Sequence, residues 1–114
     1  MPGRKNTVRC VSEEVQGDDS FVIVRRVTVK EMQEVNTRRR EAEGDDPDVA
    51  TSFYSWYANF VCQHVASWNW VDDEEAPLPQ PKDAPEIYDS LTTAEISFLD
   101  HAIFGNQTPD EAKN

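Results

Sequence analysis

The chain has 114 residues and a formal net charge of −11, with 38% hydrophobic and 29% charged residues. This size and composition indicate one small domain with a modest core, residues 1–114, and favour a soluble protein with flexible ends over a fully disordered chain. No run of about 18 apolar residues is present, which excludes a membrane-spanning helix, and no apolar stretch follows the charged first residues, so a secretory signal is not expected.

Acidity is concentrated in the second part of the chain. Residues 49–114 contain two basic and eleven acidic side chains, whereas residues 1–48 contain nine basic and eleven acidic ones. Because phosphate backbones attract basic surfaces, the second part is not expected to bind nucleic acid. The charge favours solubility, and it leaves a basic partner or phosphate mimicry open as alternatives.

Two β-prone segments open the chain. Thr7–Val11 and Ser20–Val27 are rich in β-branched residues, and Gly17-Asp18-Asp19 supplies a turn between them. This pattern predicts a β-hairpin over residues 7–28, with a connection long enough to hold a bulge.

A helix is predicted over residues 28–43. Thr28 and Glu31 form a capping box, in which each side chain accepts a hydrogen bond from the backbone N–H of the other residue. Val27 and Met32 occupy the positions of a hydrophobic staple. Gly44 and Pro47 then end the helix.

The most aromatic part of the chain is predicted to form a helix over residues 48–70, with Asp48 as its N-cap. Residues 54, 57, 61, 65 and 68 make one apolar stripe at helical spacing. The stripe is widened by Phe53, Trp56 and Phe60. A face this broad should be buried on two sides or meet a partner.

An acidic, proline-rich loop is predicted over residues 71–90. The carboxylates of residues 72–75 are followed by prolines at 77, 79 and 81, and proline cannot continue a helix. The preceding helix is therefore expected to end with exposed indole rings beside an accessible extended segment, an arrangement suited to gripping another polypeptide. The predicted partner-binding residues are Trp56, Trp68, Trp70, Val71 and Leu78.

The last predicted helix covers residues 92–105. Thr92 and Glu95 form a second capping box, and Gly105 stands where a left-handed C-cap is expected. Residues 106–114 are polar and are expected to form a flexible acidic tail. Together the elements predict an α+β fold that is mainly helical, with an N-terminal β-hairpin followed by about three α-helices.

Residues with catalytic or metal-binding chemistry do not fall into a recognisable pattern. Cys62 and His64 lie about 200° apart around a helix axis, so they cannot bind one metal ion. The acidic run lacks the alternation of a calcium loop, and there is no glycine-rich phosphate cradle or nucleophile elbow. We therefore expect no enzymatic activity, no metal and no cofactor. Cys10 and Cys62 are expected to be free thiols.

The order of these features resembles that of tail assembly chaperones from long-tailed bacteriophages. The likeness covers residues 20 to 105 and begins with a strand before a Thr-x-x-Glu helix, residues 20–31 here. A Trp-Asn motif with an acidic turn follows, Trp68–Asp73, and then a Pro-Leu-Pro element, Pro77–Pro79. A Leu-Thr-x-x-Glu helix, which starts at Leu91–Glu95, ends in glycine.

The resemblance implies a non-enzymatic chaperone that binds and solubilises the tape measure protein during tail morphogenesis. It implies a location in the host cell cytoplasm, absence from the mature virion, and no membrane or nucleic-acid partner. The tail tube protein and self-association are further partners that stay open. Two alternatives also stay open: a virion structural or connector subunit, and an acidic inhibitor or nucleic-acid mimic that presents to a basic groove the carboxylates of Asp72–Glu75, Asp83, Glu86 and Asp89.

Overall fold

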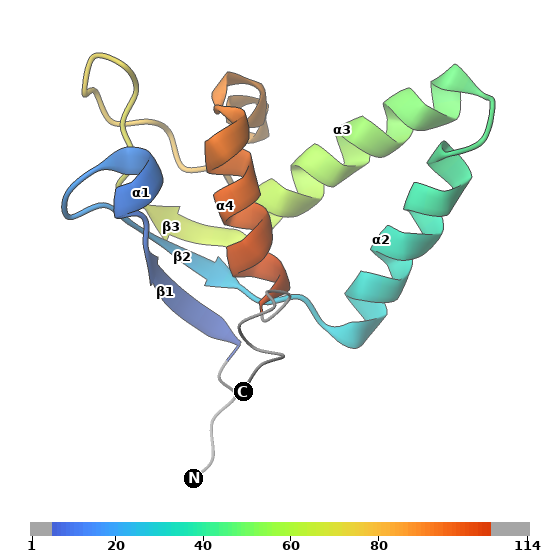
Figure 1. Cartoon of the computed structure of the whole chain (residues 1–114), viewed down its shortest axis with the longest axis horizontal. Helices are drawn as coiled ribbons and strands as arrows, with labels where there is room; N and C mark the ends of the chain where they lie inside the picture. Colours follow the sequence, from blue (N-terminus) through green and yellow to red (C-terminus); the bar gives the residue numbers. More distant parts are fainter. Residues whose placement is uncertain (1–5, 106–114) are drawn as a thin grey trace, which may run out of the picture.

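The structure, a computed structural model, describes residues 6–105 of the chain. It has the predicted α+β fold, in which helices pack on a three-stranded antiparallel sheet of strand order β1-β2-β3 (Figure 1). The predicted tail, residues 106–114, lies outside the described residues. In chain order the elements are β1 Thr7–Val11, α1 Glu13–Gln16, β2 Phe21–Arg25, α2 Val29–Ala42, α3 Pro47–Gln63, β3 Val65–Trp68, the 3₁₀ helix η1 Pro85–Ser90 and α4 Thr93–Phe104.

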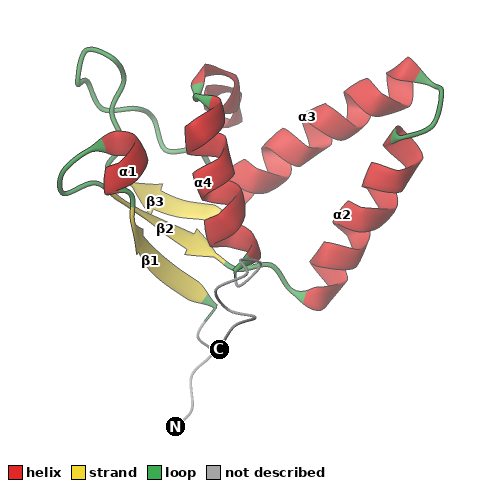
Figure 2. Cartoon of the chain, viewed as in Figure 1, coloured by secondary structure: helices red, strands yellow, loops and turns green. Residues whose placement is uncertain are grey.

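The predicted N-terminal hairpin is present, with a short helix inside its connection. Strands β1 and β2 pair antiparallel along their full length, from Thr7 opposite Arg25 to Val11 opposite Phe21. The connection holds α1 and then turns at Gly17, whose φ of 93° favours glycine. At its base the buried Ser12 donates a hydrogen bond to Ser20 Oγ over 2.8 Å. The connection therefore holds α1 at one end of the sheet (Figure 2).

Both predicted capping boxes are formed. At the start of α2, Thr28 N–H donates to Glu31 Oε1 over 2.9 Å, and Glu31 N–H donates to Thr28 Oγ1 over 3.1 Å. At the start of α4, Thr92 N–H donates to Glu95 Oε1 over 2.8 Å, and Glu95 N–H donates back over 3.1 Å. Local sequence therefore places the first turn of both helices correctly.

The expected helix over residues 48–70 starts at Pro47 with Asp46, not Asp48, as its N-cap, because the Asp46 side chain accepts from Asp48 N–H. It ends early, at Gln63, and residues 65–68 form a strand instead. Strand β3 pairs antiparallel with β2, with Trp68 opposite Val22 and a bulge near Val24. The Arg25 N–H donates to His64 O over 2.8 Å, which draws the chain onto the sheet as soon as the helix stops. Here the pairing with β2 overrides the helical spacing of the aromatic residues, because the β-branched and aromatic side chains of this segment also suit a strand.

The expected loop over residues 71–90 is held against β3 and contains η1. Val71 and Pro77 form an isolated bridge around a tight acidic turn. The Gln80 side chain then pairs with the edge of β3: Trp68 N–H donates to Gln80 Oε1, and Gln80 Nε2 donates to Trp68 O, both over 3.0 Å. This side chain satisfies two backbone groups that an edge strand would otherwise leave unpaired.

The core lies between the sheet and helices α3, η1 and α4. Alternate residues of β2 point into it, and α4 crosses the same face of the sheet (Figure 1). Cys10 and Cys62 are free thiols, as predicted. The buried members of this cluster are Val22, Val24, Val61, Cys62, Val65, Trp68, Trp70, Ile87, Tyr88, Leu99, Ala102 and Ile103.

Helices α2 and α3 form an arm that projects from this core. A short turn joins them at the tip, and they diverge toward the sheet (Figure 1). Val35 is the buried residue of α2, so this helix contributes little to the core. Its arginines instead cover the rings of α3: the Arg38 guanidinium lies 4.5 Å from the centroid of Trp56, and that of Arg39 lies 5.9 Å from Phe53.

Candidate functional site

Two of the five predicted partner-binding residues, Trp68 and Trp70, lie in the core. Only 4% of Trp68 and 0% of Trp70 is exposed, and the two rings stack with centroids 4.6 Å apart. Trp68 Nε1 donates to Pro79 O over 3.1 Å, and Trp70 Nε1 donates to Ser12 Oγ over 2.9 Å. The expectation that these indoles are available to a partner is therefore wrong.

The strand explains the burial of both tryptophans. Side chains two positions apart in an extended chain point to the same face of a sheet, so Trp68 and Trp70 both turn inward. There Trp70 meets Phe98 of α4, with ring centroids 6.2 Å apart. In the expected helix the same two residues would have pointed in different directions at a fraying end. The error in their placement thus follows from the error in secondary structure.

Trp56 lies on the helical arm and is half-buried. Its ring stacks on Phe60 at 5.2 Å between centroids, and Arg38 lies over it. This position belongs to an aromatic row along α3, in which Phe53 stacks on Tyr57 at 5.7 Å. The row continues to α4, since Tyr57 also faces Phe104 at 6.4 Å between centroids.

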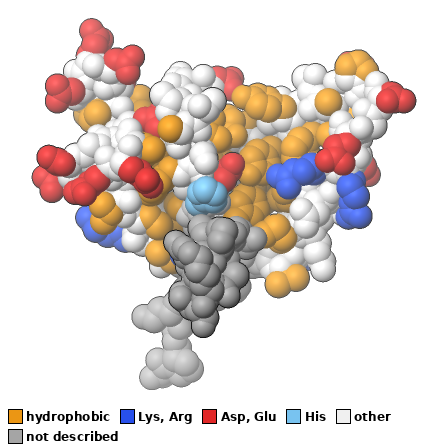
Figure 3. Space-filling view, in the orientation of Figure 1, with side chains coloured by type: hydrophobic (Ala, Val, Ile, Leu, Met, Phe, Trp, Pro, Cys, Tyr) orange, Lys and Arg blue, Asp and Glu red, His pale blue; other side chains and the backbone are white. Residues whose placement is uncertain are grey.

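A hollow of about 520 Å³ opens beside this row, between α2, α3 and α4. Hydrophobic side chains cover the surface between α4 and the helical arm (Figure 3). We call this hollow the aromatic groove, and its lining residues are Met32, Asn36, Arg39, Tyr57, Asp100, His101 and Phe104.

Two polar groups of the aromatic groove, those of Tyr57 and Asp100, are paired with each other. The Tyr57 hydroxyl donates to Asp100 Oδ1 over 3.0 Å. Burial and the negative charge of Asp100 raise the pKa of Tyr57. Burial also raises the pKa of Asp100, against the opposing effects of Tyr57, His101 and Arg39. The groove therefore presents a neutral phenol and aromatic faces, with one guanidinium and one carboxylate at its sides.

The sequence placed Tyr57 on a broad apolar face that either is buried or meets a partner, and it did not place Phe104 at a site. The unusual width of the aromatic face of α3 was the signal for this groove, because a compact core can cover only part of such a face. The position of α4 opposite Tyr57 depends on tertiary contacts, which no local pattern reports.

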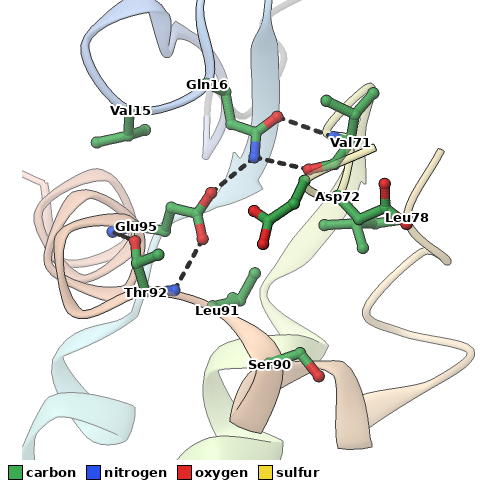
Figure 4. A pocket seen from close by; sticks show the side chains of 10 residues that line it. Val15, Gln16, Val71, Asp72, Leu78, Ser90, Leu91, Thr92 and Glu95 are labelled. Carbon is green, nitrogen blue, oxygen red and sulfur yellow. Dashed lines mark hydrogen bonds between the residues drawn. The ribbon is translucent and has the colours of Figure 1, made fainter. Parts of the chain in front are cut away.

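Val71 and Leu78, the last two predicted residues, are half-buried and line a second hollow of about 480 Å³ (Figure 4). It lies between α1, the 71–78 segment and the start of α4. We call it the acidic pocket, and its lining residues are Val15, Gln16, Val71, Asp72, Asp73, Leu78, Ser90, Leu91, Thr92 and Glu95.

Gln16 joins the three walls of the acidic pocket. Its Nε2 donates to Val71 O over 3.0 Å and to Glu95 Oε2 over 2.6 Å, while its Oε1 accepts from Val71 N–H over 2.8 Å (Figure 4). Glu95 is 8% exposed and is held from its other oxygen by the capping box of α4. No local pattern connects Gln16 with residues so distant along the chain.

Within residues 6–105, no group of three or more histidine, cysteine, aspartate or glutamate side chains is arranged to hold a metal ion. His64 is buried, with Nδ1 2.8 Å from Phe60 O, and His101 is exposed. None of the helices in this range is long and apolar enough to cross a membrane.

Comparison of the chain with protein-family models, with curated proteins and with solved structures gives no match.

Proposed function

We propose that this chain is a non-enzymatic tail assembly chaperone that binds the tape measure protein of a long-tailed phage and keeps it soluble during tail assembly. The tape measure protein is proposed as the client because residues 20 to 105 resemble such chaperones. The observation that carries the proposal is the aromatic groove, a hollow of about 520 Å³ that can accept part of another protein.

The groove lies between helices and has Met32, Tyr57 and Phe104 in its lining, a setting that suits an amphipathic helix, the form in which tape measure proteins are expected. Such a helix binds by laying its apolar face into a hydrophobic groove between other helices. The rings of Tyr57 and Phe104 offer rigid apolar area at a small cost in side-chain entropy. Arg39 and Asp100 can pair with polar groups at the margins of the client helix.

The net charge of −11 supports the same role. A client coated with acidic subunits carries a high negative charge, and the repulsion between coated clients opposes aggregation. The chaperone then supplies solubility from its outer surface and affinity from the aromatic groove.

A capture experiment tests the proposal. Co-expression with a candidate tape measure protein should yield a complex that survives moderate salt, because apolar contacts are little screened. Asn36→Trp places an indole in the groove from an exposed position of α2 and should weaken capture by about tenfold or more. The matched control is Asn59→Trp, at an exposed position of α3 outside the groove lining, which should capture normally.

Equal capture by Asn36→Trp and Asn59→Trp would reject the groove as the client site. A complex that dissociates at moderate salt would instead favour the acidic inhibitor or mimic. For that alternative the carboxylates lie apart: Asp72 and Asp73 line the acidic pocket, whereas Glu86 and Asp89 line a hollow against α3. The groove therefore offers the better-defined binding surface.

A further inference from the structure

We propose that the acidic pocket binds a lysine or arginine side chain from a segment of a partner polypeptide. The site is distinct from the aromatic groove, so this inference goes beyond the proposed function and does not depend on the identity of the client. It rests on the shape of the pocket, on its one-sided charge and on the way in which its carboxylates are held.

The pocket has apolar walls and an acidic lining. Val15, Val71, Leu78 and Leu91 line it, and each is half-buried, so each presents part of its side chain to the hollow. Lysine and arginine carry an aliphatic stem below their charge, and such side chains bury the stem along apolar surface while the charge seeks a polar partner. Walls of this kind therefore suit the stem of a basic side chain.

Every charged residue that lines the pocket is acidic: Asp72, Asp73 and Glu95. The surrounding segments have the same sign, since residues 11–24 and 66–81 together contain eight carboxylates and neither lysine nor arginine. Acidic side chains gather at the end of the molecule that carries α1 and the 71–78 segment (Figure 3). A cation of the partner would supply the charge that this end lacks, and an anionic partner such as nucleic acid would be repelled.

Two of the three carboxylates, those of Asp72 and Glu95, are held in place before any ligand arrives. Asp72 Oδ1 accepts from Glu74 N–H over 2.8 Å and from Ala76 N–H over 3.0 Å. Glu95 is fixed by Gln16 and by its own capping box. Figure 4 shows Asp72 and Glu95 approaching the same space from opposite sides. Preorganised acceptors bind a cation without a further loss of side-chain entropy, which favours affinity.

A polypeptide fits the surroundings better than a free amine does. A second hollow of about 440 Å³ lies next to the acidic pocket, and the two share Gln16 and Val71. Asp18, Asp19 and Glu75 line this second hollow, again without a basic residue. An extended segment can cross from one hollow to the other and place a basic side chain in the first, whereas a free alkylamine would use one hollow alone.

The test is a titration of the full chain, followed by amide chemical shifts, with two blocked five-residue peptides. One peptide carries a central lysine between leucines, and its match carries norleucine in place of lysine. The lysine peptide should give saturable shifts at Gln16, Val71 and Glu95 and should bind at least about tenfold more tightly than the norleucine peptide. Equal binding of the two, or the absence of saturable shifts with the lysine peptide, would overturn the proposal.

Two double variants localise the site. Asp72→Asn with Asp73→Asn removes two charges but keeps the Oδ1 acceptor at position 72, and it should weaken binding of the lysine peptide by about tenfold. Glu43→Gln with Asp45→Asn removes two exposed charges near the tip of the arm and should leave binding within about twofold of the unmodified chain. Equal affinities of the two variants would refute the assignment, and binding of n-pentylamine as tight as that of the peptide would refute the polypeptide partner.

Discussion

At the scale of single residues, the two buried indoles are the clearest case of side chains whose role is structural. Each indole N–H has a partner inside the molecule, Pro79 O for Trp68 and Ser12 Oγ for Trp70. Buried polar groups that are paired in this way stabilise the fold and are not available to bind a partner. The indoles of Trp68 and Trp70 are therefore part of the core, and the proposed client site lies elsewhere, in the aromatic groove.

Trp70→Phe should destabilise the protein more than Trp68→Phe does. Loss of the Trp70 indole removes the hydrogen bond that the buried Ser12 Oγ accepts and leaves only its bond to Ser20, and a lost hydrogen bond of this kind costs about 0.5–1.5 kcal/mol. Loss of the Trp68 indole frees Pro79 O on an exposed residue, where water can replace it. Urea unfolding of the two variants measures the difference, and an equal loss of stability in both would contradict this account.

Glu31 connects α2 with the end of α3 and should make stability depend on pH in acid. Partial burial alone would raise its pKa, but the hydrogen bond from Thr28 N–H and the neighbouring side chains of His64 and Arg25 together lower the pKa from 4.5 to about 2. His64 Nε2 lies 3.4 Å from Glu31 Oε1. Because the folded state holds the ionised form, this stabilisation is complete above pH 4.5 and is lost as the pH falls toward about 2.

The variant Glu31→Gln isolates this contribution, since glutamine can still accept the capping hydrogen bond. We expect the free energy of unfolding of the unmodified protein to fall more steeply between pH 4.5 and about 2 than that of the variant. Urea titrations at several pH values check it. Parallel pH profiles would show that Glu31 does not couple folding to protonation.

At the scale of elements, the strand β3 shows where local reasoning stops. Both capping boxes were predicted and are present, because a cap involves residues three positions apart. The end of α3 was misplaced because Val65–Trp68 suits either a helical stripe or a strand. The segment forms a strand because it pairs with the edge of β2, and because the Gln80 side chain hydrogen-bonds to the opposite edge of β3.

Gln80→Ala should therefore loosen β3 specifically. The change removes both hydrogen bonds to the Trp68 backbone, and we expect a loss of about 1–3 kcal/mol in the free energy of unfolding. Hydrogen exchange at the Trp68 amide should accelerate as well. Gln33→Ala, at an exposed position of α2, is the matched control and should change stability by less than about 0.5 kcal/mol. Unchanged exchange at Trp68 in Gln80→Ala would argue against this role.

At the scale of the whole molecule, the two hollows differ in chemistry. The aromatic groove lies between the helical arm and α4 and offers aromatic rings together with the hydrogen-bonded pair of Tyr57 and Asp100. The acidic pocket lies beside α1 and the 71–78 segment and offers carboxylates above apolar walls. A client with an amphipathic helix and a nearby basic segment could engage both at once, and the second contact would then raise the affinity through effective concentration.

The sequence by itself determined the mainly helical α+β class, the N-terminal hairpin and the starts of α2 and α4, because alternation and caps act over a few neighbouring residues. It also placed Val71 and Leu78 outside the helices, because the prolines that follow Val71 cannot continue a helix. Only the tertiary structure decided that the indoles of Trp68 and Trp70 face inward, and that Gln16 and Glu95 meet across the acidic pocket. These outcomes depend on contacts between segments that lie far apart along the chain, and the free energy of such contacts leaves no local pattern in the sequence.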